Sequence, residues 1–194
     1  MRELIFATNN QHKADEIQPV LRDGFKVLTL RESGIEIDIP EPYDSLEENA
    51  KTKARTIYQM TGQNCFSEDT ALEVNSLNGE PGVKSARYAG DGRDAGANTG
   101  KLLNKLSDQE DRSGRFRTVI ALILDGQEYL FEGICEGSIA DQPRGVKGFG
   151  YDPVFIPRGD NRTFAEMDLA EKNQYSHRAK AVSKLVDFLN SSYH

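Results

Sequence analysis

The feature that most constrains the fold is a strand–turn–strand pattern near the middle of the chain. Residues 115–124 and 127–135 are strand-like, and Asp125-Gly126 between them is a strong signal for a two-residue hairpin turn. Further short apolar runs, such as residues 4–7 and 27–30, alternate with segments of helical periodicity. A hairpin inserted among interleaved strands and helices predicts an α/β fold with a mixed sheet.

The expected helices have recognisable ends. Ser45 and Glu48 form a capping-box pattern, and Gly62 is a plausible stop for the helix between them. Thr163 and Glu166 repeat the capping-box pattern further on. The other expected elements are strands at 65–67, 72–74 and 154–156, a helix from about 13 that Pro19 interrupts or kinks, and helices at 98–106 and 176–189.

Length and composition limit the class of protein. A chain of 194 residues without a linker or repeat predicts one domain that can bury a substantial core. Its net charge of −7 argues against duplex nucleic acid as a partner, but it allows a small anionic ligand held with a metal ion. We expect Cys65 and Cys135 to be reduced core residues. With no signal peptide and no apolar run long enough to span a membrane, a soluble cytoplasmic protein is expected.

The turn after the first strand is a candidate phosphate site. Thr8 and Asn10 add donors where a helix begins, and Lys13 lies near the same end. Free backbone N–H groups and the helix dipole suit an anion at such a position. The glycines of a Walker loop are absent. An ordinary Asn-rich turn is the alternative.

The adjacent acids Glu68 and Asp69 are candidate metal ligands. In an extended chain they point to opposite faces, whereas a bend would let both reach one site. Glu41 adds another acid in the loop before a helix. Hard oxygen ligands of this kind suit magnesium, which is commonly shared with substrate phosphates. A solvated turn is the alternative for the acid pair.

Two later segments are candidates for binding a planar ring. In residues 148–153 the glycines allow close approach of the backbone, and Phe149 and Tyr151 offer aromatic faces, although they could instead be core anchors. His177 and Arg178 place basic groups in the first turn of the last helix, against the helix dipole. The Arg178 fork suits carbonyl or phosphate oxygens. A surface His-Arg pair is the alternative.

In combination these segments closely resemble the inosine/xanthosine triphosphate pyrophosphatase family over essentially the whole chain. The matching segments are 7–13 (ATNNQHK), 48–50 with Lys53, 67–70 (SEDT), 81–88 (PGVKSARY), 148–153 (GFGYDP) and 176–178 (SHR).

The resemblance implies an elongated, two-lobed α/β molecule, with a long mixed sheet and a central substrate cleft, formed by residues 1–194 as a single domain. It also implies a homodimer that depends on Mg²⁺. The implied activity is hydrolysis of ITP, dITP and XTP to the monophosphate and pyrophosphate, at the bond between the α- and β-phosphates. Such an enzyme cleanses the nucleotide pool.

The resemblance also implies roles for individual residues. Asp69 would be the general base, and the metal ligands would be Asp69, Glu41 and Glu68. Thr70 would contact substrate, and Arg178 would be among the donors to the 6-oxo group of the base. The triphosphate would lie along Thr8, Asn9, Asn10, Gln11, His12, Lys13 and Lys53. The base pocket would comprise Phe149, Gly150, Tyr151, Asp152, Lys172, His177 and Arg178.

Some positions depart from the family pattern. Many bacterial members of the family have two aspartates where this chain has Glu68-Asp69, and Ser-Gly where it has Thr70-Ala71. The Glu68 side chain is one methylene longer than that of aspartate, which puts its metal role in doubt. Asn9 stands where glycine is usual, and Asn would tolerate a left-handed backbone there. Two alternative functions stay open. One is a pyrophosphatase for modified pyrimidine or methylated nucleotides, and the other is a nucleotide-sensing or RNA-binding module, although the acidic charge argues against RNA.

Overall fold

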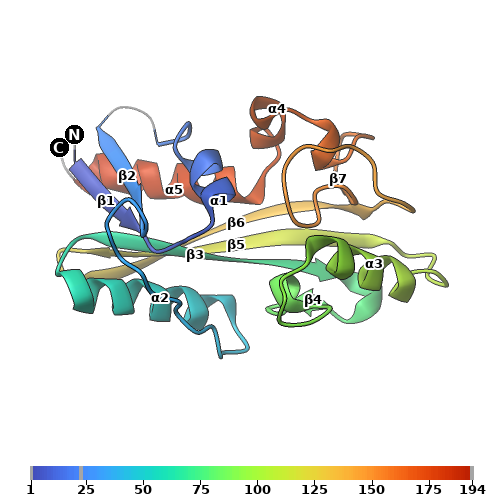
Figure 1. Cartoon of the computed structure of the whole chain (residues 1–194). Coiled ribbons are helices and arrows are strands. Elements are labelled where there is room, and N and C mark those ends of the chain that lie inside the picture. Colours follow the sequence, from blue (N-terminus) through green and yellow to red (C-terminus); the bar gives the residue numbers. More distant parts are fainter. Residues whose placement is uncertain (1, 22–23, 193–194) are drawn as a thin grey trace. The chain divides into compact units, whose positions relative to one another are not determined.

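A computed structural model describes residues 2–21 and 24–192 (Figure 1). The strands are β1 (Arg2–Phe6), β2 (Phe25–Thr29), β3 (Cys65–Val74), β4 (Pro81–Gly82), β5 (Ser113–Leu124), β6 (Gln127–Ile139) and β7 (Phe155–Pro157). The α-helices are α1 (Gln11–Ile17), α2 (Leu46–Thr61), α3 (Ala95–Lys105), α4 (Leu169–Asn173) and α5 (His177–Ser192). Short 3-10 turns are η1 (Asn75–Leu77), η2 (Ser85–Arg87) and η3 (Phe164–Glu166). Within the described ranges, no helix has both the length and the apolar character that a membrane crossing requires.

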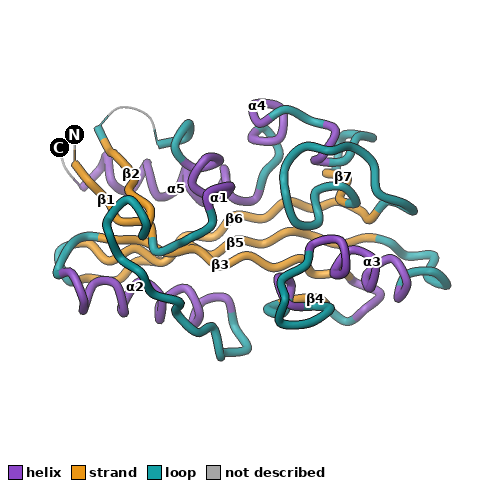
Figure 2. Tube along the Cα trace, viewed as in Figure 1, coloured by secondary structure: helices purple, strands orange, loops and turns teal. Residues whose placement is uncertain are grey.

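The strands form a mixed sheet, as the central hairpin predicts. Their order is β2-β1-β3-β5-β6-β7, with β4 paired to β3. Strand β1 runs parallel to β2 and β3, whereas β3–β4 and β6–β7 are antiparallel pairs. The neighbouring strands β5 and β6 are joined by a tight turn (Figure 2) in which Asp125 and Gly126 have φ values of 51° and 82°. Positive φ at both positions is the geometry that an Asp-Gly hairpin favours.

The chain divides into two compact units. The first comprises Met1–Asp69, Thr118–Gly133 and Arg178–His194, and the second comprises Thr70–Arg117 and Ile134–His177. Strands β3, β5 and β6 each contribute residues to both units, and α5 begins in the second and continues in the first.

The first unit buries one face of its strands against α1 and α5. Phe6 and Phe66 stack at 4.5 Å between ring centroids in a cluster that also takes side chains from both helices. Helix α1 ends at Ile17, so Pro19 follows the helix rather than interrupting it. The fully buried α5 side chains in this cluster are Ala181, Val182, Leu185 and Leu189.

Helix α2 has the ends that its sequence predicts. The Ser45 hydroxyl accepts a hydrogen bond from the Glu48 N–H at 3.2 Å, and Gly62 terminates the helix with φ 67°. The buried α2 side chains follow helical spacing: Leu46, Asn49, Ala50, Lys53, Ala54 and Ile57. Asn49 and Lys53 are the two polar residues in this otherwise apolar stripe.

The second unit has its own core, which lies around Phe116, Phe155 and Phe164 and includes Leu102 and Leu106 of the α3 segment. Helix α3 begins at Ala95, three residues earlier than expected, because the Asp94 carboxylate caps it by accepting from the Ala97 N–H. Cys65 and Cys135 are both free and buried, as predicted.

Candidate functional site

Strand β3 carries both acids and sends them to opposite faces. The expected break between strands at 65–67 and 72–74 is wrong, and so is the alternative of a solvated turn, because β3 is continuous and both Glu68 and Asp69 are buried. The extended chain, and not the bend, is therefore the arrangement of the acid pair. Phe66 packs in the cluster with α1 and α5, whereas the Ser67 hydroxyl donates to the Ala50 carbonyl of α2. Strand alternation therefore turns Glu68 toward α1 and α5, and Asp69 toward α2.

The Asp69 carboxylate faces Lys53 on the buried side of α2. The Lys53 Nζ lies 2.7 Å from Glu41 Oε1 and 3.9 Å from Asp69 Oδ1, and it donates to the Glu68 backbone carbonyl at 2.7 Å. Three separate segments, the loop before α2, α2 itself and β3, thus meet at one ammonium group. Because that lysine is buried, the acids around it are held by charge as well as by hydrogen bonding.

The loop that carries Glu41 is fixed by Asn49. The Asn49 side chain accepts from the Tyr43 N–H and donates to the Tyr43 carbonyl, both at 3.0 Å. Asn49 is buried on α2, one turn before Lys53. This two-way contact gives a structural reason for Asn49, which is part of the matching segment 48–50. The capping box explains only its neighbour Glu48.

Burial raises the pKa of Asp69 to about 6. Lys53 and Lys13 oppose this shift, whereas Glu41 and Glu68 add to it. A carboxylate with such a pKa is ionised at neutral pH and still basic enough to accept a proton from water during a reaction. Asp69 therefore has the properties of a general base.

Glu68 is enclosed by basic groups on the opposite face of β3. Its Oε1 lies 2.5 Å from Lys13 Nζ and 3.4 Å from Arg178 Nη2, and its side chain is fully buried. Arg178 Nη1 lies 2.6 Å from Glu16 Oε2. The alternative of a surface His-Arg pair is wrong, because His177 and Arg178 are both buried. Two carboxylates compensate the position of Arg178 in the first turn of α5.

Glu16 is a site residue that the sequence analysis did not identify. It is buried on α1, three residues after Lys13, in a helix whose other buried residues are Ala14 and Ile17. A glutamate on the apolar side of this helix, three residues after Lys13, could have indicated a buried ion pair. Only the fold reveals its partner, because Arg178 lies 162 positions away in the chain.

The N-terminal turn uses several of its polar groups internally. Thr8 Oγ1 accepts from the Asn10 N–H at 3.0 Å, Asn9 Nδ2 donates to the Ile37 carbonyl, and Gln11 Nε2 donates to Asp15. His12 is exposed. The backbone of Asn9 does not have a positive φ, so no left-handed geometry explains the departure from glycine.

The expected metal ligands do not form a trio. Within residues 2–21 and 24–192, no three His, Cys, Asp or Glu side chains form a group that could hold a metal ion. Lys53 lies between Glu41 and Asp69, and Glu68 faces Lys13 and Arg178. Magnesium commonly takes only one or two carboxylates together with water and substrate phosphates. The hard oxygens of Glu41 and Asp69 fit that chemistry, whereas Glu68 fits a role in holding Lys13.

In the second unit Asp152 organises the glycine-rich loop. Its Oδ2 accepts from the Phe149 N–H at 3.0 Å and from Lys172 Nζ at 2.7 Å. Gly148 has φ 73°, and a Cβ there would lie 2.1 Å from Asp152 Oδ2, so a side chain at this position would displace the Asp152 carboxylate. The Lys172 Nζ lies 5.0 Å from the centroid of the Phe149 ring. These contacts bring together Phe149, Asp152 and Lys172, three of the residues expected in the base pocket.

The two aromatic residues of this loop have different environments. Tyr151 is buried in the core and its hydroxyl donates to the Ser85 carbonyl at 2.6 Å, so this ring is a core anchor. Phe149 is half-buried and keeps the stacking role open. His177 stacks on Phe116 at 4.5 Å between ring centroids. Gly150 has φ 60°, and Thr70 is half-buried in β3.

Known proteins resemble this chain over nearly its full length. The Ham1 family model matches residues 4–188. Proteins named dITP/XTP pyrophosphatase are 52% identical in Porphyromonas gingivalis, over 97% of this chain and 98% of the relative, and 46% identical in Flavobacterium johnsoniae, over 98% and 99%. A solved structure of a HAM1 protein from Coxiella burnetii has a TM-score of 0.89 at 39% identity, covering 98% of this chain and all of that one. The resemblance seen in the sequence is therefore confirmed, and the chain belongs to the Ham1 family.

Proposed function

We propose that this protein is a nucleoside triphosphate pyrophosphatase that hydrolyses ITP, dITP and XTP to the monophosphate and pyrophosphate. Its relatives carry the name dITP/XTP pyrophosphatase. The observation that carries the proposal is the buried Asp69, with its raised pKa, beside Lys53 and Glu41. A general base next to fixed positive charge suits attack of water on a phosphate ester or anhydride.

The residues of the first unit divide the chemical work. Asp69 orients the attacking water and accepts its proton as the new bond to the α-phosphorus forms. The ammonium groups of Lys13 and Lys53 attract the triphosphate and stabilise the negative charge that moves onto the leaving pyrophosphate. The Asn10 N–H already donates to Thr8 Oγ1, so the further donors that we assign to the same phosphates are the Thr8 hydroxyl and the Asn10 side-chain amide, just before α1.

Magnesium is part of this proposal, with Glu41 and Asp69 as the residues that would hold it. When bound, it supplies neutralising charge to the phosphates of the substrate. Lys53 lies between these two carboxylates, so its ammonium stabilises them in the absence of metal. We assign Glu68 to the placement of Lys13 and Arg178, because both cations already surround it.

The base would be recognised by residues of the second unit. Phe149 offers a ring for stacking, and the Lys172 ammonium close to it suits the 6-oxo group of hypoxanthine or xanthine. Adenine presents an amino donor at that position, and an unpaired buried donor costs about 1–3 kcal/mol. The guanidinium of Arg178 contacts Glu16 and Glu68, which supports a positioning role in place of direct contact with the base.

The test of this function is a substrate panel with product identification. Purified protein is incubated with magnesium and ITP, dITP, XTP, ATP or a methylated pyrimidine triphosphate, and pyrophosphate release is followed. ITP, dITP and XTP should be turned over in preference to ATP. Equal turnover of ITP and ATP would overturn the specificity, and ITP binding without pyrophosphate release would favour a nucleotide sensor. We also infer that the protein is a cytoplasmic homodimer. Sedimentation equilibrium would measure its mass in solution.

A further inference from the structure

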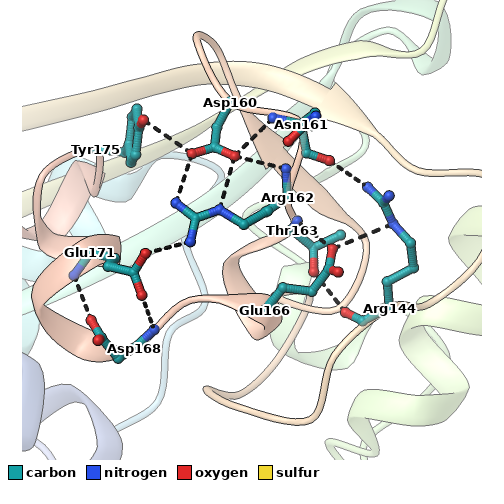
Figure 3. Close-up of polar contacts among 9 residues, drawn as sticks. All are labelled: Arg144, Asp160, Asn161, Arg162, Thr163, Glu166, Asp168, Glu171 and Tyr175. Carbon is teal, nitrogen blue, oxygen red and sulfur yellow. Dashed lines mark hydrogen bonds and ion pairs between the residues drawn. The ribbon is translucent and has the colours of Figure 1, made fainter.

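A charged network in the second unit connects the loop after β7 to α4 (Figure 3). Arg162 donates from Nε and Nη2 to the two carboxylate oxygens of Asp160, at 3.2 and 3.0 Å, and from Nη1 to Glu171. Asp160 Oδ2 also accepts from the Tyr175 hydroxyl at 3.1 Å. Asp160 and Arg162 together therefore hold the α4 segment on both sides of Lys172, at Glu171 and at Tyr175.

Helix α4 depends on such contacts because it is only five residues long. A helix of this length has no stability of its own in water. The Glu171 carboxylate uses both oxygens to fix it, since Oε1 accepts from the Asp168 N–H at the start of the helix and Oε2 accepts from Arg162. The same acid thus closes the capping box and connects the helix to the loop (Figure 3).

The residue after Glu171 is Lys172, whose ammonium contacts the buried Asp152 at 2.7 Å. That Asp152 oxygen also accepts from the N–H of Phe149. A shift of α4 would therefore move Lys172 relative to both the loop and the Phe149 ring.

We propose that Arg162 is a positioning residue for base recognition: through Asp160 and Glu171 it sets the place of Lys172 beside Phe149 and Asp152. This inference rests on the proposed function, in which Phe149 and Lys172 recognise the base of the substrate. Arg162 would touch neither the base nor the phosphates, and its effect on the reaction would pass through α4.

The exposure of Arg162 separates positioning from bulk stability. Its side chain is 40% exposed, so its ion pairs contribute little to the free energy of unfolding. The guanidinium nevertheless engages two carboxylates at once, Asp160 through a two-pronged contact. Lysine has the same charge but lacks the planar guanidinium that donates to both carboxylates, so R162K should restore only part of the function.

The experiment compares wild type, R162A and R162K with R158A, which removes an exposed arginine from the same loop. Steady-state kinetics with ITP and ATP are combined with thermal unfolding and with hydrogen exchange over residues 168–176. We expect R162A to raise the KM for ITP about tenfold, with a much smaller change in kcat, and to lower the ITP/ATP preference. Its melting temperature should stay within about 2 °C of wild type while residues 168–176 exchange faster. R162K should lie between wild type and R162A, and R158A should match wild type.

Two results would overturn the proposal. One is an R162A protein with unchanged KM, unchanged preference and unchanged exchange, and the other is a loss that R158A reproduces. If R162A did not fold, R162K would decide between the same outcomes. Failure of the wild-type protein to release pyrophosphate from ITP would instead refute the proposed function, and the exchange of residues 168–176 would still report whether Arg162 fixes α4.

Discussion

At the scale of single residues, each buried acid of strand β3 lies beside a basic side chain of opposite charge. Asp69 lies in a continuous strand among buried neighbours, which would be unfavourable without Lys53. Glu68, one residue earlier, is matched on the other face by Lys13 and Arg178. The adjacent acids therefore have different partners and are expected to have different roles.

Replacing Asp69 by Asn should remove the proton acceptor and leave the shape of the side chain. We expect kcat for ITP to fall by about 10²- to 10⁴-fold, the usual contribution of a positioned general base. The control is D108N, which changes an exposed aspartate in the second unit. An active D69N enzyme would show that another group takes the proton.

At the scale of elements, local patterns predicted the ends of α2 and the hairpin turn, because Ser45, Gly62 and Asp125-Gly126 act on their immediate neighbours. The continuity of β3 could not be predicted in this way. Glu68 and Asp69 look like an interruption until their partners are known. Glu68 pairs with Lys13, 55 positions away, and with Arg178, 110 positions away, whereas Asp69 faces Lys53. The Arg162 network was missed for a similar reason, since its connection to Lys172 passes through a five-residue helix.

Two glycines of the loop before β7 offer a matched test of its geometry. Gly148 and Gly150 both have positive φ, but only at Gly148 would a Cβ meet the Asp152 carboxylate. Alanine at either position has a backbone strain of about 1–2 kcal/mol. We expect G148A to raise the KM for ITP well beyond the effect of G150A, because only G148A displaces Asp152 from Phe149 and Lys172. Equal effects of the two variants would mean that backbone strain alone matters.

At the scale of the whole molecule, the alternation of strands and helices around one hairpin predicted a mixed α/β fold, which the strand order confirms. The predicted lobes and substrate cleft remain expectations. The family was recognisable from the segments of the candidate site. The pairing of each charge, including Glu16 with Arg178, required the fold.

The pH dependence of global stability should carry the signature of Asp69. Its folded pKa of about 6 lies above the unfolded value of 3.8, so the folded protein binds more protons between these values. The stability of the metal-free protein should therefore fall as pH rises from about 4 to about 6, by up to about 3 kcal/mol from this group. D69N should lack that component and be at least as stable as wild type at neutral pH. Chemical unfolding across this range, with a chelator present, measures the difference, and parallel curves for the two proteins would contradict the assignment.

The most direct test of the central claim is the fate of isotopically labelled water during ITP hydrolysis. If Asp69 directs water to the α-phosphorus, mass spectrometry should find the label in IMP, with unlabelled pyrophosphate as the other product. Label in the pyrophosphate, or release of orthophosphate in its place, would contradict this account.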